Sequence, residues 1–167
     1  MTDETTTNDY DRRSQELWAA IDEYSEQDFL AKIEALVRDL PPESALAPFE
    51  RACAFDSTGH PDQAVPLYRE ALARGLDPYR RRRATIQMAS SLRNLGHADE
   101  SVALLQAERT AQSDELDDAV SATLALALVD TGREREAVSI ALSALAPHLP
   151  RYQRSVANYA RDLLTGE

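Results

Sequence analysis

The chain has 167 residues, with 18 basic and 29 acidic side chains and a formal net charge of −11, which argues against general nucleic-acid binding because phosphates demand a basic surface. Its length fits one domain or one short repeat array. It has no run of the ~20 apolar residues that a membrane helix requires, and its single cysteine, Cys53, has no partner for an internal disulfide, so we expect a cytoplasmic protein.

The first forty residues predict a tail and a helical hairpin. Residues 1–12 are polar and acidic and are predicted to be a disordered tail. Residues 13–40 show two apolar stripes at helical spacing and are predicted to form a degenerate N-terminal hairpin. Ser25, with Asp28 three residues later, is typical of the N-cap of the second helix.

From Glu43 onward one pattern occurs three times. Each copy has a glycine that is predicted to end a helix, and five residues later a small residue early in the next helix. The glycines lie 37 and 36 residues apart (96 − 59 and 132 − 96), and a period in the mid-thirties predicts a helical repeat protein. The glycine and small-residue pairs are Gly59 with Ala64, Gly96 with Ser101, and Gly132 with Ala137.

These copies predict the domain organisation. Residues 13–167 are expected to form a single all-α domain of about nine helices, packed as antiparallel hairpins. Its parts after the first hairpin are repeat 1 (43–78), repeat 2 (79–114), repeat 3 (115–147) and a capping helix (151–164). Within the repeats the predicted helices lie at about 43–58, 61–75, 79–95, 98–110, 115–131 and 134–146.

The register resembles the tetratricopeptide repeat, which has small residues at its eighth, twentieth and twenty-seventh positions, large apolar residues at its eleventh and twenty-fourth, and glycine at its fifteenth. The three copies read Ala52, Phe55, Gly59, Ala64, Tyr68, Ala71; Ala89, Leu92, Gly96, Ser101, Leu105, Glu108; and Ala125, Leu128, Gly132, Ala137, Ala141, Ala144. Glu108 departs from the pattern, so the second helix of its repeat is expected to pack less well. The chain is similar to a compact bacterial group of such proteins.

The resemblance implies a right-handed α-solenoid and a non-enzymatic scaffold or adaptor. Such a protein binds a peptide or protein segment in its concave groove, with no cofactor. Two alternatives stay open, a regulator that responds to an anion or small ligand and a structural homo-oligomer such as a homodimer. No binding of nucleic acid or membrane is expected.

In this family the first helix of each repeat lines the groove, and the middle repeat offers hydrogen-bond donors there. A helical wheel gives a similar polar stripe, with no acid in it, that could hold a carboxylate or phosphate. The alternative is a solvated face whose arginines pair with the acidic first fifty residues. The predicted ligand-binding residues are Arg80, Arg83, Gln87, Ser90, Arg93 and Asn94, whereas Arg81 and Arg82 are expected at the surface.

The first and third repeats offer different groove surfaces. In the first repeat Glu50 and Asp56 would repel a carboxylate, so a clamp for a partner's C-terminus is not predicted. In the third repeat apolar groove positions predict an interface. We expect the last helix of the chain to cover them, although a second copy or a partner helix could do so. The interface residues are Leu126, Val129, Tyr152, Val156 and Tyr159.

No residue pattern predicts catalysis or a metal site. His60 and His97 occupy equivalent turns of successive repeats, about 10 Å apart, which is too far for a shared metal ion. Cys53 is interpreted as a small buried thiol. Neither a phosphate-binding glycine loop nor a nucleophile elbow occurs in the sequence.

Overall fold

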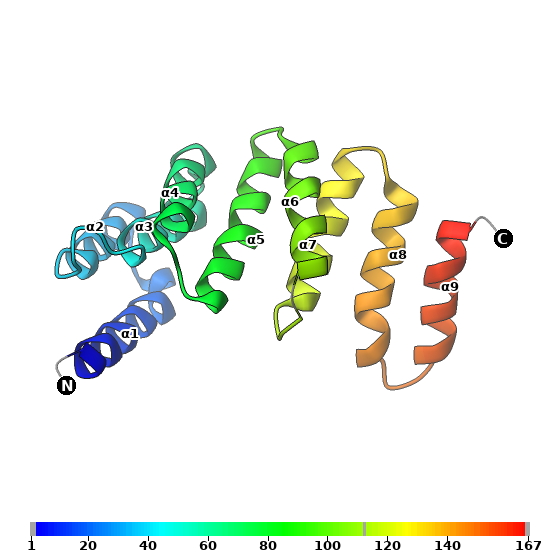
Figure 1. Ribbon diagram of the computed structural model, residues 1–167, viewed down its shortest axis with the longest axis horizontal. Coiled ribbons are helices and arrows are strands. Elements are labelled where there is room, and N and C mark those ends of the chain that lie inside the picture. The colour runs from blue at the N-terminus through cyan, green and yellow to red at the C-terminus, as the bar shows by residue number, and fades with distance from the viewer. Residues whose placement is uncertain (1–2, 112, 166–167) are drawn as a thin grey trace. The chain divides into compact units, whose positions relative to one another are not determined.

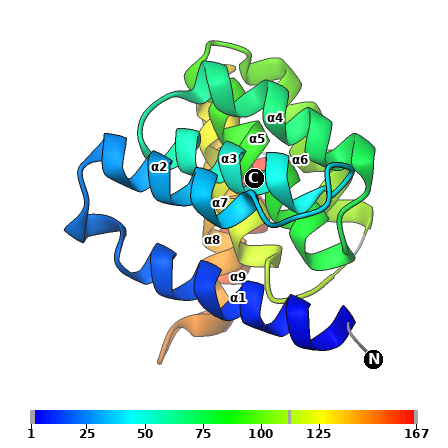
Figure 2. The same ribbon diagram turned by 90° about the vertical axis from the view of Figure 1, so that its left-hand side faces the viewer.

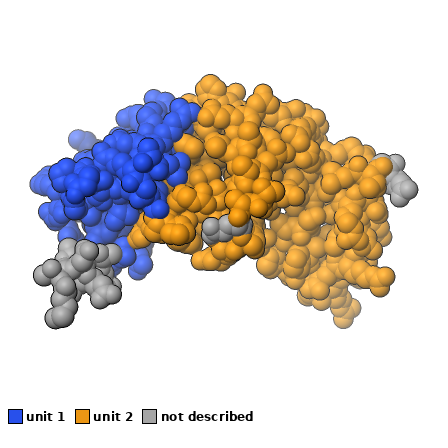
Figure 3. All heavy atoms as spheres, viewed as in Figure 1, with its two compact units in different colours: residues 1–76 blue, residues 77–167 orange. Residues whose placement is uncertain are grey.

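The computed structural model of this chain describes residues 3–111 and 113–165, and the side chains from residue 9 onward. Within these ranges the regular structure consists of nine α-helices and two 3-10 helices, with no strand. The predicted all-α fold is thereby confirmed. The chain divides into two compact units, residues 1–76 and residues 77–167, which Figure 3 shows in different colours. A single continuous domain over residues 13–167 stays a prediction.

The first unit, seen from its own side in Figure 2, is built on two helical hairpins. Ser25 caps the second helix as predicted, because its hydroxyl accepts the Asp28 N–H at 3.2 Å. Phe29 and Ile33 of that helix pack with Ala54 of the next one in the core. The elements are α1 (Asp3–Ala19), η1 (Ile21–Glu23), α2 (Glu26–Val37), α3 (Leu46–Ser57) and α4 (Pro61–Arg74).

Helix α1 begins at Asp3, so the structure differs from the disordered tail predicted over residues 1–12, of which residues 1 and 2 lie outside the described range. Tyr10 is buried, with 6% of its surface exposed. Arg12 contacts Asp9 at 2.6 Å and Glu16 at 2.9 Å, one turn before and one turn after it. Pairs at these spacings support a helix by a few tenths of a kcal/mol each, roughly. Residues 3–12 hold one aromatic residue and charged side chains that pair locally, so the sequence shows no apolar stripe that would predict a helix there.

The second unit continues as successive antiparallel helices, which follow one another in Figure 1. Leu105, Val120, Leu124, Leu128 and Ile140 are buried together in its core. Its elements are α5 (Pro78–Asn94), α6 (Ala98–Ala111), α7 (Asp117–Asp130), α8 (Glu134–Leu145), η2 (Ala146–His148) and α9 (Gln153–Thr165). From α3 onward each helix lies within three residues of its predicted bounds.

The three glycine turns share one geometry. Gly59, Gly96 and Gly132 have φ angles of 87°, 86° and 74°, in the left-handed region that glycine adopts without steric cost. Each glycine N–H bonds to the carbonyl three residues before it, at 3.0 to 3.2 Å. The next N–H bonds to the carbonyl five residues before it, at 2.8 to 2.9 Å. This pair of bonds is a Schellman motif, so the glycines end the first helices as predicted.

The small residues after these turns are buried where the two helices of each hairpin meet. Ala64 and Ser101 are fully buried and Ala137 is 2% exposed. Only small side chains fit there because the helix axes approach closely beside the turn. Ser101 differs from the two alanines in one respect: its hydroxyl has no hydrogen-bond partner among the described residues.

A candidate binding face on α5 and α7

Helix α5 carries the predicted donor stripe, and its start is capped. One Asp77 oxygen accepts the Arg80 N–H at 3.0 Å, and the other contacts Arg80 Nη1 at 3.0 Å. Pro78 occupies the first turn, where its missing N–H costs nothing. The helix then runs to Asn94 without a break, so residues three and four apart share a face.

The donor stripe is partly exposed along this helix. The Arg83 guanidinium carbon lies 6.0 Å from the centre of the Tyr79 ring, at the outer limit of a cation–π contact. Of the predicted residues, Arg80, Arg83, Gln87, Ser90 and Arg93 are half-buried and Asn94 is exposed.

Arg93 is held by the neighbouring helix. Its Nε lies 2.6 Å from Asp130 Oδ2 at the end of α7, and 26% of its side chain is exposed. The two helices pack directly against each other. The pair therefore fixes the register of α5 and α7, and Arg93 forms part of the wall of the face.

Two apolar side chains stand exposed on α7 next to this pair. Leu126 is 53% exposed and Val129 is 49% exposed. Leu126 lies one turn before Asp130, which joins α5 through Arg93. We call the surface formed by Arg83, Gln87, Ser90, Leu126 and Val129 the α5–α7 face. It combines hydrogen-bond donors of α5 with exposed apolar side chains of α7, a helix that packs against α5.

The last helix does not cover this face, contrary to the favoured expectation. Helix α9 packs against α8 and η2. Tyr152 and Tyr159, expected to lie over Leu126 and Val129, are 74% and 65% exposed, and Val156 is half-buried. Backbone geometry contributes to this placement, because Tyr152 has a positive φ of 70° and turns the chain sharply before α9.

Arg82, expected at the surface, is fully buried. Its Nη2 lies 2.7 Å from Asp117 Oδ1, its Nη1 contacts Asp114 Oδ1, and its Nε lies 3.5 Å from Glu108 Oε1. We call these four residues the Arg82 cluster. It joins α5 to α6 and to the start of α7, so Arg82 has a structural role.

Glu108 explains why the second helix of the middle repeat departs from the family pattern. It is buried and accepts two hydrogen bonds from Arg81, at 2.6 and 2.9 Å, in addition to its contact with Arg82. The expectation of poorer packing is therefore corrected, since the acid fits as an acceptor for two arginines. Glu108 stands where the other copies have Ala71 and Ala144. This acid is the sequence signal that could have indicated a contact with Arg81 and Arg82.

Several arginines of α5 pair with acids of the second unit. Asp77 pairs with Arg80, Asp130 with Arg93, and the acids of the Arg82 cluster with Arg82. The Ser113 hydroxyl, the Arg82 guanidinium and the Asp114 N–H hold the pKa of Asp117 below its usual 3.8.

Glu50, expected to face an open groove, is buried in the first unit. Its two carboxylate oxygens accept bonds from Ser14 Oγ at 3.0 Å and Trp18 Nε1 at 2.8 Å. Helix α1 therefore occupies this position on α3. The sequence did not indicate this because both donors lie more than thirty residues away.

The histidines and the cysteine are placed as follows. His60 Nε2 lies 2.6 Å from Glu26 Oε1, and His148 Nε2 lies 2.8 Å from Asp118 Oδ2. Cys53 is buried. No group of three His, Cys, Asp or Glu side chains among the described residues could hold a metal ion. Likewise, no helix in this part of the chain is long and apolar enough to cross a membrane.

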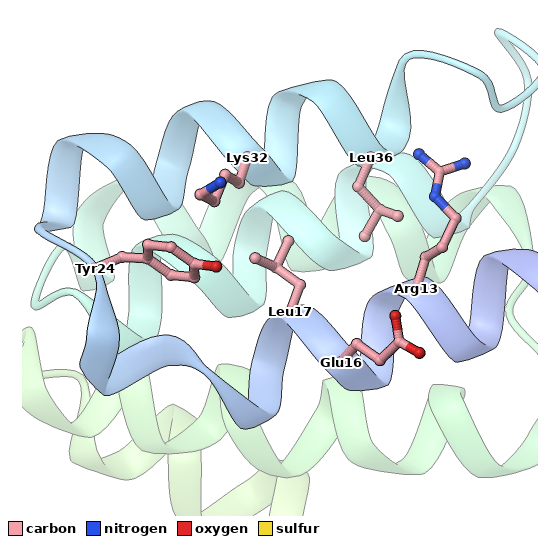
Figure 4. A pocket seen from close by; sticks show the side chains of 6 residues that line it. All are labelled: Arg13, Glu16, Leu17, Tyr24, Lys32 and Leu36. Carbon is pink, nitrogen blue, oxygen red and sulfur yellow. The ribbon is translucent and has the colours of Figure 1, made fainter.

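A cavity of about 310 Å³ lies between α1 and α2 in the first unit (Figure 4). Leu17 and Leu36 form its apolar middle. Lys32 lies 4.6 Å from the centre of the Tyr24 ring at one end. At the other end are Arg13, 3.5 Å from Asp39, and Glu16, which pairs with Arg12. Its charges are of both signs and are held by neighbours, so it is the weaker candidate for a site.

Comparison with known proteins agrees with this architecture. The family model described as tetratrico peptide repeat matches residues 45–163. The crystal structure of nearly identical TPR-like repeats, from a Podosopora anserina protein named as a kinesin light chain, is similar with a TM-score of 0.69. The identity is 19%, over 93% of this chain and 86% of that chain, so this likeness concerns the fold. No curated protein matches the sequence.

Proposed function

Because this chain belongs to the tetratricopeptide repeat family, whose members generally bind proteins, we propose that it is an adaptor that holds a partner segment on the α5–α7 face. Repeat folds of this kind are typically interaction scaffolds and not enzymes. The observation that carries the proposal is the exposed pair Leu126 and Val129 on α7, the helix that the Arg93–Asp130 pair joins to α5. A cytoplasmic location stays a prediction.

The chemistry of the face indicates the kind of segment that fits. Leu126 and Val129 favour an apolar side chain, because burying a side chain of their size stabilises a complex by about 1.5–3 kcal/mol. Arg83 and Gln87 favour acceptors, either carboxylates or backbone carbonyls. A partner segment with one apolar side and one acidic side satisfies both helices at once.

A pull-down with matched variants tests this proposal. Leu126→Glu and Arg83→Glu place an acid on the face and are expected to lose the partners that the wild type recovers. Val138→Glu is the control, since Val138 is 47% exposed on α8, outside the face. The proposal fails if all variants recover the same partners.

The same variants test the alternative that the protein is a structural homo-oligomer. An exposed apolar pair can be covered by a second copy, which would make the chain a homodimer. Light scattering of the wild type and Leu126→Glu distinguishes the two. A wild-type dimer that Leu126→Glu converts to a monomer assigns the face to self-association, and a wild-type monomer leaves it to a partner.

A further inference from the structure

A cavity of about 300 Å³ lies among α6, α7, α8 and α9, outside the α5–α7 face. Arg109, in the last turn of α6, and Arg161, in α9, both line it. Ser121 and Ser143 add hydroxyl groups, while Ile140 and Leu164 provide apolar walls. No acid is among the described residues that line it, although the whole chain has a net charge of −11.

Several donors in this cavity have no acceptor among the residues that the structure describes. Ser139 Oγ is engaged, since it donates to the Ala160 carbonyl at 2.6 Å and ties α8 to α9. Arg161 donates to Asn158 Oδ1, which is neutral. The side chains of Arg109, Ser121 and Ser143 form no hydrogen bond or ion pair with the described residues. Two guanidinium charges therefore share one cavity with no counterion among residues 3–111 and 113–165.

Two other cavities of similar size differ on this point. The α1–α2 cavity in Figure 4 includes Glu16, and its Arg13 pairs with Asp39. A cavity of about 370 Å³ beside the α7–α8 turn is lined by two acids, and its Arg133 pairs with Glu136 at 2.7 Å. In both cavities an acid lines the wall, whereas no described acid lines the cavity among α6, α7, α8 and α9, which we call the α6–α9 cavity.

We infer that the α6–α9 cavity binds a small organic anion, a carboxylate or phosphate monoester that carries a short hydrocarbon chain. Its headgroup accepts charge-assisted hydrogen bonds from Arg109 and Arg161 and bonds from the serine hydroxyls. Its hydrocarbon part lies against Ile140 and Leu164. A volume of about 300 Å³ stands at the lower end of the range for ligand sites, which limits the hydrocarbon to a few carbons.

The ligand joins elements that are otherwise linked through α8. Arg109 belongs to α6 and Arg161 to α9, so an anion bound to both stabilises the folded unit against unfolding. At a ligand concentration ten times the dissociation constant, we expect Tm to rise by about 3 to 6 °C.

Thermal unfolding of the full chain at constant ionic strength tests the inference, with n-butyl phosphate and butyrate as the two anion probes. Inorganic phosphate and n-butylammonium chloride are the reference compounds. The expected result is a Tm increase with at least one anion probe that exceeds the increase with inorganic phosphate. The probe with the larger effect identifies the headgroup as phosphate or carboxylate.

Variants distinguish binding in this cavity from nonspecific stabilisation of the protein by anions. Arg109→Gln removes one guanidinium from the cavity, and we expect it to weaken binding of the better probe at least tenfold by calorimetry. Arg154→Gln is the matched control, an exposed arginine on the same helix as Arg161 but outside the cavity, and it retains wild-type affinity. Arg83→Glu also retains it, because the α5–α7 face is a different surface.

Three results would overturn the inference: no Tm increase with either anion probe, an equal increase with inorganic phosphate, or an undiminished effect in Arg109→Gln. Circular dichroism of each variant without ligand establishes that it is folded. If Arg109→Gln is unfolded, Arg161→Gln takes its place and the same outcomes apply.

Discussion

Ser101 carries a hydroxyl where the other two repeats carry a methyl group, at Ala64 and Ala137. All three positions are buried, and the Ser101 hydroxyl has no partner among the described residues. Burying an unpaired hydroxyl costs about 1–3 kcal/mol. Serine is also a poorer helix former than alanine.

We therefore expect Ser101→Ala to raise the free energy of unfolding by about 1 kcal/mol. Urea denaturation measures this change. The matched controls are Ala64→Ser and Ala137→Ser, which introduce the same unpaired hydroxyl and are expected to be destabilised by a similar amount. A Ser101→Ala variant less stable than the wild type would show that the hydroxyl has an acceptor.

Neighbouring residues can have opposite environments that a helical wheel does not resolve. Arg82 and Arg83 are adjacent, yet Arg82 is fully buried and Arg83 is half-exposed. The wheel places Arg83 on the polar stripe, and its side chain is partly exposed. It does not predict that Arg82 is buried, because its carboxylate partners come from α6 and the start of α7, 26 to 35 residues away (108 − 82, 117 − 82).

At the scale of elements, the glycine turns are the feature that sequence predicts best. Their hydrogen bonds join residues three and five apart, so they depend on local conformation. These turns separate successive helices, so the helix bounds from α3 onward could be predicted from them. Helix α1 has no such turn, and its first residues resemble a tail in sequence because Tyr10 is the only large apolar residue between Met1 and Leu17.

Gly96→Ala provides a direct test of the turn. A Cβ at this position would meet no heavy atom within 4 Å, so the substitution adds no clash and changes only the backbone preference at φ 86°. We expect a loss of about 1–2 kcal/mol in the free energy of unfolding, measured by urea denaturation.

Gly96→Asn serves as the comparison for that experiment, because asparagine enters the left-handed region more easily than alanine does. It should lie between the wild type and Gly96→Ala in stability. Equal stability of all three proteins would mean that the left-handed conformation is not retained at this turn.

At the scale of the whole molecule, the acidic composition makes stability at low pH depend on how carboxylates are held. The pKa of Asp117 is lowered by the Ser113 hydroxyl, by Arg82 and by the Asp114 N–H. As the pH falls, the unfolded chain therefore takes up this proton before the folded protein does. The stabilisation is fully present above about pH 4 and is lost as the pH falls through the lower pKa of the folded state.

Asp117→Asn removes this contribution. We expect the wild type to be more stable than the variant at pH 6, and the difference to shrink at pH 3, as measured by urea denaturation at both values. Ser113→Ala removes the first of the three causes of the lowered Asp117 pKa. It should reduce the part of the free energy of unfolding that is lost between pH 6 and pH 3. A difference that is equal at both pH values would contradict the assignment.

The sequence by itself determined the helical repeat, its period and its turns, because these depend on spacing within one or two helices. Only the tertiary structure decided which side chains are buried, paired or exposed. It buried Arg82 and Glu50, paired Arg93 with Asp130 and left Leu126 and Val129 exposed. The physical reason is that burial and ion pairing depend on contacts between helices that are distant in sequence, whereas turn geometry depends on adjacent residues.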